Sequence, residues 1–512
     1  MSSTDDVSPA AQSTETASTS TTIKTEPKAS HLSNKEDVCE TTKNENDDQP
    51  SLMIEQEEEV ETQVEEDEEM GNDGVGGTTL VAPLCITTIL PTDTDEERYR
   101  KTCLFVARIG WYACFYGATP DRVEVFLRHL MQHFGYHGCL FRVTNSELFC
   151  VFCRDVEDDD QVMRMYEVKE GLNLHHLGLL NEVCKQVCSG ELTQAQALGA
   201  LEKIRKEPDP WGIWPVSISF LATGALAPAV FQGTWWDLLG GAICCLPVYG
   251  LVVGLPASYQ KALPLLSSFA ASIVAILLQQ LVMTELQVEL VVLAAVIIQV
   301  PGYGASLAVS EIITNHITAG VGRLVNALVT LGLLVGGYWL AVNLFVFMED
   351  VDSPGDVNDL DTTSSDPIPV LVQALVCAPC LMVALAIQFQ ISFPDFPWAF
   401  LNLMLAYGAS YAATELSGGK KNVGVLLASV AVTVFAQAWA RWKDRPRSIL
   451  ITPAIVVLVS GSIGFRGLVS LAIEGDPSAA GLQEFAQMFV VALLIIAGLL
   501  IGDLLLRAPT TL

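Results

Sequence analysis

The carboxyl-terminal part of the chain alternates long apolar segments with short polar ones. From residue 211 onward most apolar segments are about 17–25 residues long, the length that a helix needs to cross roughly 30 Å of hydrocarbon. The pattern predicts an α-helical polytopic membrane protein. We place ten transmembrane helices at 213–231, 237–256, 262–283, 286–301, 321–347, 368–391, 397–416, 422–440, 449–466 and 484–506. The fourth is short because Pro301 and Gly302 interrupt it.

Residues 96–210 show a different pattern, in which apolar positions recur at helical spacing in some segments and alternate in others. Gly117 has the form of a helix end, and Thr119-Pro120 that of a helix start. The segments 138–143 and 147–154 flank Thr-Asn-Ser and predict a β-hairpin. With helices predicted at 97–117, from 120 onward, at 174–188 and at 193–206, they indicate a small cytosolic α+β domain.

The first 95 residues are acidic and rich in serine and threonine. Residues 1–90 hold 21 of the 58 acidic residues but only four lysines, and residues 1–78 contain no aromatic residue. Such a segment cannot bury enough apolar surface to offset the entropy of ordering, so we predict a disordered tail. The tail could be a phosphorylated regulatory arm or, as we favour, a solvating segment. The formal charge of −30 argues against nucleic acid as a partner.

Side chains that could perform catalysis or bind a metal are present but poorly arranged for either. The 13 cysteines include two CxxC pairs, at 150–153 and 377–380, and neither has a second pair or histidines at zinc spacing. His129 and His133 lie four positions apart without the glutamate of an HExxH motif. No nucleophile has a recognisable base nearby in sequence. We therefore predict that the protein is not an enzyme and has no catalytic residue, metal site or cofactor.

The basic residues near the predicted spans are distributed unequally between the two sides of the membrane. With the amino terminus in the cytoplasm, Lys420 and Lys421 fall outside, whereas ten basic residues fall inside. This asymmetry predicts the orientation, because cytoplasmic loops are enriched in lysine and arginine. The ten are Lys203, Arg205, Lys206, Lys261, Arg323, Arg441, Lys443, Arg445, Arg447 and Arg507.

An acidic loop divides the predicted spans into two groups of five. The loop, at 349–367, contains no basic residue, so we expect it on the non-cytoplasmic side. It separates a first membrane half, residues 211–348, from a second half, residues 368–512. Five spans per half would invert the second half relative to the first, which is the arrangement of many secondary transporters.

Each half contains one apolar helix that runs into a glycine-rich interruption. The first interruption follows Val300 and the second follows Val459. Broken helices at corresponding places in two halves are the sequence feature that best indicates a transport site. Small residues can also serve close helix packing, but the polar residues nearby favour transport. The candidate site comprises Pro301, Gly302, Gly304, Glu311, His316, Arg323, Gly461, Gly464 and Arg466.

Several stretches of the chain resemble the threonine/serine exporter family. They are YGATPDRVEVFLRHL at 116–130, GLNLHHLGLLNEVCKQVCSGELTQAQALGAL at 171–201 and PGYGASLAVSEIITNHITAGVGR at 301–323. A further stretch, SGSIGFRGL at 460–468, resembles the small second subunit that is separate in bacterial members and is fused here, as in fungal pheromone-regulated membrane proteins. Ser460 stands where members commonly have proline, and the tail has no counterpart in the family.

The resemblance implies a secondary transporter that exports threonine and serine, or dicarboxylates such as succinate, driven by protons. Glu311 and His316 lie five positions apart and could together pass a proton near neutral pH. Arg323 and Arg466 could hold a substrate carboxylate by paired hydrogen bonds. For Arg323, a role as a cytoplasmic topology anchor is an equal alternative.

Other functions remain open at this level. A passive channel, or a membrane scaffold whose soluble domain recruits partners, would also suit a polytopic protein with a soluble domain. For the transporter we expect a small-molecule substrate, protons and the lipid bilayer as partners, and the sequence leaves a homo-oligomer open.

Overall fold

The computed structural model describes residues 94–506, except 145, 155–160, 169–170, 350–366, 459–460 and 474–478. The predicted disordered tail lies almost wholly outside the described residues, as does the acidic loop predicted on the non-cytoplasmic side. The chain is mostly helical, with one small sheet near the amino terminus.

The N-terminal domain, from α2 to α5, combines helices with a three-stranded antiparallel sheet. Its elements are α2 (Asp95–Phe115), α3 (Pro120–His133), β1 (Leu140–Val143), β2 (Glu147–Phe152), β3 (Val162–Glu167), α4 (Leu174–Cys188) and α5 (Gln194–Lys206). The predicted hairpin is confirmed, with Phe141 opposite Cys150. The third strand was not predicted, because none of its residues is buried and it lacks an alternating apolar face.

Local sequence explains where the helices of this domain begin and end. Gly117 follows α2 at φ +92°, a backbone conformation that favours glycine. Pro120 occupies the first position of α3, where its missing N–H costs nothing. Thr193 and Gln196 form a reciprocal capping box at the start of α5. All four predicted helices of the domain are therefore confirmed.

The rest of the described chain forms a bundle of helices. They are α6 (Ile213–Val230), α7 (Trp235–Gly254), η1 (Ala257–Ala262), α8 (Leu263–Leu281), α9 (Val288–Val296), α10 (Gly302–Ile313), α11 (Ile317–Glu349), α12 (Val370–Val372), η2 (Gln373–Cys377), α13 (Ala378–Gln388), α14 (Phe396–Leu416), α15 (Lys421–Lys443), α16 (Ser448–Leu458), α17 (Gly461–Ile473) and α18 (Ala479–Leu505). The segment from α12 to α13 is one continuous helical run.

Within the described part of the chain, eight helical segments are long and apolar enough to cross a membrane; one of them, 448–472, includes the undescribed residues 459–460. They are candidates for eight of the ten predicted spans. The predicted span 286–301 corresponds to the short helix α9 and the break that follows it. The predicted span 397–416 corresponds to α14, a helix of 21 residues in which polar side chains interrupt the apolar ones. For these two segments, membrane crossing stays a prediction.

The two halves pack their helices in the same pattern. Within the first half α8 packs against α9 and α11, and within the second half α15 packs against α16 and α18. Between the halves, α11 packs against α17 as α18 packs against α10. Gly337 lets α11 approach Ser268 on α8, and Gly498 lets α18 approach Ser429 on α15. Ser429 follows Ser268 by the same number of positions as Gly498 follows Gly337. The serine and the glycine that meet in the first half therefore correspond to those that meet in the second.

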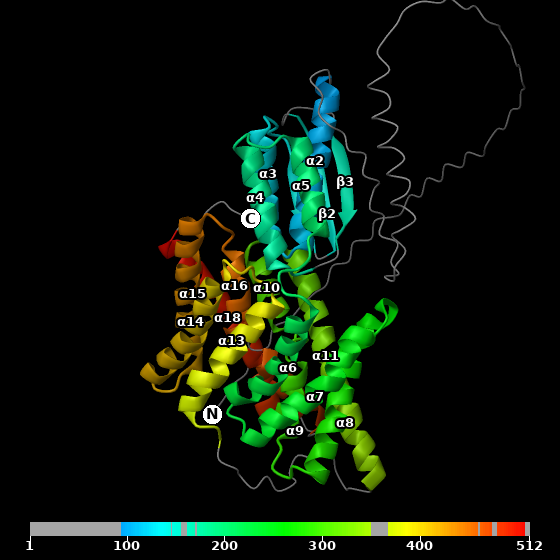
Figure 1. The fold of residues 1–512 in the computed structure, drawn as a ribbon, viewed down its shortest axis with the longest axis vertical. Helices are drawn as coiled ribbons and strands as arrows, with labels where there is room; N and C mark the ends of the chain where they lie inside the picture. The colour runs from blue at the N-terminus through cyan, green and yellow to red at the C-terminus, as the bar shows by residue number, and fades with distance from the viewer. Residues whose placement is uncertain are drawn as a thin grey trace, which may run out of the picture. The chain divides into compact units, whose positions relative to one another are not determined.

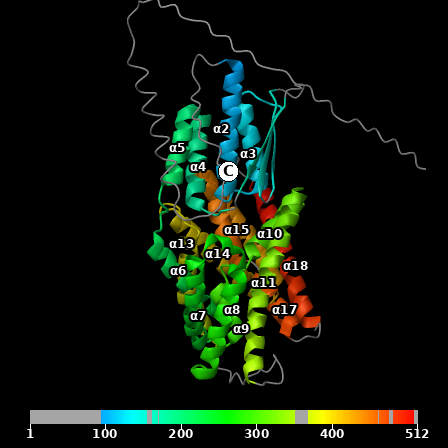
Figure 2. The same ribbon diagram turned by 90° about the vertical axis from the view of Figure 1, so that its right-hand side faces the viewer.

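Two polar side-chain contacts, one of them an ion pair, join the N-terminal domain to the bundle. Lys185 on α4 places its Nζ 2.8 Å from Oδ2 of Asp444, in the turn between α15 and α16. Glu124 on α3 places its Oε2 3.1 Å from Nε2 of His316, in the turn between α10 and α11. Figures 1 and 2 show the domain, in blue to cyan, at the end of the bundle where α10 lies. The domain therefore contacts one turn from each half.

Replacing Gly337 by alanine tests the close approach of α11 and α8. The new Cβ would lie 2.3 Å from the carbonyl oxygen of Leu265, so the helices must separate, and we expect a loss of about 1–3 kcal/mol. The measurement is the thermal unfolding midpoint of the purified protein in detergent. Gly332→Ala on the same helix is the control, because its Cβ meets no atom within 4 Å. Equal midpoints for the two variants would contradict this packing.

Candidate functional site

The segments at the two predicted interruptions meet in the structure. The first break separates α9, which ends at Val296, from α10, which begins at Gly302; the second predicted interruption, at 459–460, lies outside the described residues, between α16 and α17. A Cβ on Gly461 would lie 2.7 Å from Cγ1 of Val300 and 3.1 Å from Cα of Gly302. Contact this close requires glycine. We call the place where Gly461 contacts Val300 and Gly302 the crossing. Pro301, Gly302 and Gly461 of the predicted site are thus brought together.

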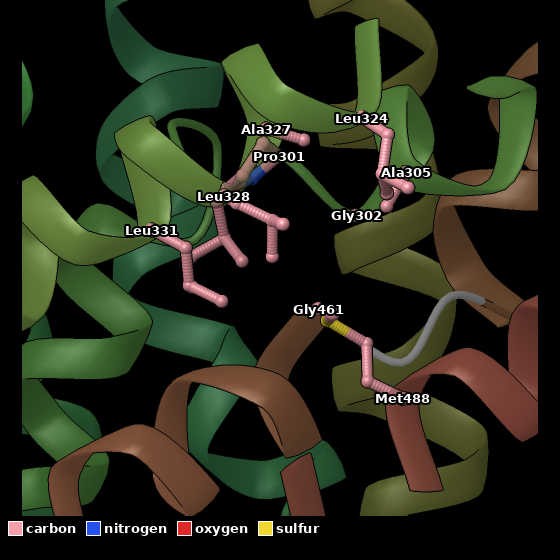
Figure 3. Close-up of a pocket in the computed structure, with 10 residues that line it drawn as sticks. Pro301, Gly302, Ala305, Leu324, Ala327, Leu328, Leu331, Gly461 and Met488 are labelled. Carbon is pink, nitrogen blue, oxygen red and sulfur yellow. The ribbon is translucent and has the colours of Figure 1, made fainter. Parts of the chain in front are cut away.

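A small cavity lies at the crossing. Figure 3 shows it between residues of α10 and α11, such as Ala305, Leu328 and Leu331, and Gly461 with Met488 from the second half. All of its lining residues are apolar or glycine, and it has room for about one water-sized group. Gly464 does not line the cavity, but its missing side chain leaves space for Met488, which does. In this conformation the crossing is closed to a solute.

Buried polar groups near the first break were not among the predicted site residues. Gln299, just before Pro301, donates from Nε2 to Oγ of Ser267 at 3.0 Å. Among the described residues, Oε1 of Gln299 and the Oγ atoms of Ser268 and Ser306 are buried without a hydrogen-bond partner. Unsatisfied polar atoms are costly in an apolar interior and suit a place where water or a polar solute binds. The signal in the sequence was the polar pair Ser267-Ser268 inside an apolar segment.

Glu311 and Arg323 form a buried ion pair between α10 and α11. Nε of Arg323 donates to both carboxylate oxygens of Glu311, at 3.0 and 3.2 Å. Glu311 is 2% exposed, so water does not stabilise its negative charge and the positive charge of Arg323 must do so. Arg323 is therefore more than a positively charged anchor near the membrane surface.

His316 points away from Glu311 and toward the N-terminal domain. Its Nε2 lies 3.1 Å from Oε2 of Glu124, and its Nδ1 lies 3.2 Å from Oγ1 of Thr314. The second oxygen of Glu124 accepts the backbone N–H of Val143 at 2.9 Å. Glu311 and His316 thus have different ionic partners, and the second pair joins the bundle to the domain.

Arg466 contacts residues of the first half but not Glu311. Its Nε is 3.9 Å from Oε1 of Glu289 at the start of α9, and its guanidinium lies over the ring of Phe231 at 5.7 Å. The contact joins α17 of the second half to α9 of the first. Gly304, in contrast, lies on α10 where a Cβ would meet no atom within 4 Å. The nine predicted residues therefore divide between the crossing, three ion pairs and the surface of α10.

Comparison with known proteins places this architecture in a family. A family model described as "Putative threonine/serine exporter" matches residues 104–345, and one described as "Threonine/Serine exporter, ThrE" matches residues 374–505. The chain belongs to the threonine/serine exporter family. The first match includes both the N-terminal domain and the first membrane half, so the family shares the two as a unit. Members are transporters, and this chain is a multi-pass membrane protein of that family.

Individual relatives are distant. A "Probable threonine/serine exporter" of Mycobacterium tuberculosis is 20% identical over 80% of this chain and 77% of its own length. An uncharacterised protein of Schizosaccharomyces pombe is 21% identical over 70% of this chain, and "Pheromone-regulated membrane protein 10" of Eremothecium gossypii is 22% identical over 47%. The matched part spans 47% and 33% of those two fungal proteins. No solved structure matches the chain.

The cysteines and histidines of this exporter-family chain have ordinary structural environments. Cys150 and Cys153 are buried, and burial raises the pKa of the Cys150 thiol to about 12, so the thiol stays protonated. His129 and His133 are exposed on α3. Across the described residues, no three His, Cys, Asp or Glu side chains gather as metal ligands.

Neutralising Glu311 tests the buried ion pair. Glu311→Gln leaves the positive charge of Arg323 poorly compensated, and we expect a loss of about 3–5 kcal/mol in stability. The double variant Glu311→Gln/Arg323→Gln should recover part of this loss, because it removes the charge left behind. Thermal unfolding in detergent measures both. Arg466→Gln is the comparison: its pair is longer and partly exposed, so it should cost about 1 kcal/mol or less.

Proposed function

We propose that this exporter-family protein is a secondary transporter that exports small amino acids, such as threonine and serine, or small organic acids, coupled to protons. The contact between Gly302 and Gly461 carries this proposal. It supports a solute path where the helix break of the first half meets the glycine-rich segment of the second. Family membership supports the transport class.

The crossing offers charges that suit a zwitterion. The C-terminal end of α9 and the N-terminal end of α10 lie at the first break, beside Gly461, the first described residue of α17. Helix N-termini carry partial positive charge and favour a carboxylate, whereas C-termini carry partial negative charge and favour an ammonium group. The buried, unpartnered Oε1 of Gln299 adds an acceptor beside them. An α-amino acid has both charges that this arrangement would stabilise.

The packing of the halves supports alternating access. If the bundle is an inverted repeat of five segments per half, α11 with α17 and α18 with α10 are equivalent contacts. Rocking one half on the other would loosen one of these contacts while the other tightens. The pair Glu311–Arg323 joins α10 to α11 and the pair Glu289–Arg466 joins α9 to α17, so this motion would change the geometry of both pairs.

Glu311 is our candidate for proton coupling. Its carboxylate is buried and held by Arg323, so adding a proton would weaken the pair and release the guanidinium. A freed guanidinium could then bind a substrate carboxylate. His316 would act less directly, through its contact with Glu124 of the N-terminal domain.

Transport by purified protein tests the function. Proteoliposomes with the wild type should exchange labelled threonine, serine or succinate, and a pH gradient should drive net uptake. Gly461→Val should reduce transport at least tenfold, because the valine side chain would collide with Val300 and Gly302. Gly332→Val on α11 is the matched control, since a Cβ there meets open space. Flux of the wild type that ignores the pH gradient would favour a passive channel instead. Equal transport by both variants would remove the crossing from the path.

Cysteine labelling tests the proposed orientation, with the amino terminus in the cytoplasm. In a background without other cysteines, Lys420→Cys in intact cells should react with a membrane-impermeant maleimide, because it follows α14 on the proposed outer side. Lys443→Cys at the end of α15 should react only after the membrane is permeabilised. The reverse result would invert the topology.

A further inference from the structure

A second pocket lies between the N-terminal domain and the bundle, separate from the cavity at the crossing. It has a cavity volume of about 90 Å³ and is partly open to solvent. Its walls come from the start of α3, from α10, from the start of α16 and from α18. The N-terminal domain therefore contributes directly to a pocket on the membrane bundle.

Two arginines line this pocket, and each lies at a helix N-terminus. Arg122 is in the first turn of α3, and Arg447 directly precedes α16. The backbone N–H groups at a helix N-terminus add partial positive charge to that of the guanidinium. An anion in the pocket would face positive charge from both the domain and the second membrane half.

The two arginines line one pocket and affect each other electrostatically. Burial lowers the pKa of Arg122 to about 10, and the positive charge of Arg447 contributes in the same direction. Arg447 is fixed by an ion pair with Asp503, which also accepts a hydrogen bond from Gln437. Because each arginine raises the cost of the other's charge, a bound anion would relieve their repulsion.

Ser306 is an independent sign of a missing ligand. It lines the pocket, is 1% exposed, and its Oγ has no hydrogen-bond partner among the described residues. The Oγ of Ser448, also in the wall, is buried and unpartnered in the same way. Ser306 follows Gly302 by about one helical turn, so the pocket reaches the helix that starts at the crossing.

We propose that this pocket binds the transported amino acid on its way to the crossing, with Arg122 and Arg447 holding the carboxylate. Asp121, also in the wall, can accept the ammonium group. The carboxylates of Asp121 and Asp503 balance the arginines, so the pocket suits a zwitterion better than a doubly charged phosphate or dicarboxylate. This inference rests on the proposed transport function and assigns a substrate-binding role to the N-terminal domain.

Substrate binding to the full chain in lipid nanodiscs tests the proposal by calorimetry. Threonine and serine should bind the wild type, and Arg122→Gln should weaken binding about 10- to 100-fold, as expected for loss of a charge-assisted hydrogen bond to the carboxylate. Arg122→Lys should recover only part of the affinity, because lysine lacks the bidentate geometry. Arg128→Gln removes the same charge from the exposed face of α3 and should bind like the wild type.

Substrate analogues separate a binding role from a structural one. In the wild type, threonine amide, which lacks the carboxylate, should bind as weakly as threonine binds to Arg122→Gln, and Arg122→Gln should not weaken the amide further. Asp121→Asn should weaken threonine but not N-acetylthreonine, which has no ammonium group. A general loss of stability would weaken both ligands of a pair, whereas loss of one specific contact weakens only the ligand that makes it. Inorganic phosphate is a competitor in a separate arm.

The outcomes distinguish this inference from the transport proposal. If proteoliposomes transport amino acids but Arg122→Gln binds and transports them with unchanged affinity, the pocket is not on the path and only this inference fails. If the wild type binds threonine through Arg122 but no proteoliposome transports it, the site stands and the transport proposal fails. Binding of phosphate but of no amino acid, or of nothing at all, would overturn the proposed ligand.

Discussion

The close contact between Gly302 and Gly461 is the constraint on which the rest of the bundle depends. Gly302 begins α10 after the break that follows α9, and Gly461 is the first described residue of α17. A side chain at Gly461 would push against the backbone of Gly302, so the halves could not approach as they do. The contact brings the end of α9 and the start of α10 close to α17. The backbone groups at these helix ends carry partial charges. They can therefore stabilise a charged solute inside an apolar bundle without a charged side chain at that place.

The charged side chains lie around that centre and are paired. Glu311 is matched by Arg323 within the first half, whereas Glu289 and Arg466 come from different halves. The tighter of these pairs is the more buried one, as expected where water cannot screen a charge. Both pairs can therefore respond to movements of the helices that carry them. A third group of charges lies between the N-terminal domain and the bundle, where Arg122 and Arg447 line a common pocket.

The elements of the fold that depend on local sequence could be predicted, and those that depend on distant partners could not. The capping residues and Gly117 define the helices of the N-terminal domain, and length with apolarity defines most membrane spans. The edge strand β3 has no buried face and therefore no periodic signal. Both interruptions were visible as glycine-rich segments in the sequence, and the structure brings Gly302 and Gly461, one from each, into contact. The partners of His316 and Arg466 and the joint pocket of Arg122 and Arg447 depend on tertiary contacts that no local pattern specifies.

The attachment of the N-terminal domain has a mechanical consequence. One of its helices holds the turn at His316, in the first half, and another holds the turn at Asp444, in the second. A rigid body fastened to both halves resists any change in the distance between those turns. When the halves move apart at that end, the domain must either lose one of these two contacts or tilt together with one half. A soluble module that looks like an appendage in the sequence is thus placed to act as a latch, whose strength sets how readily that end of the bundle opens.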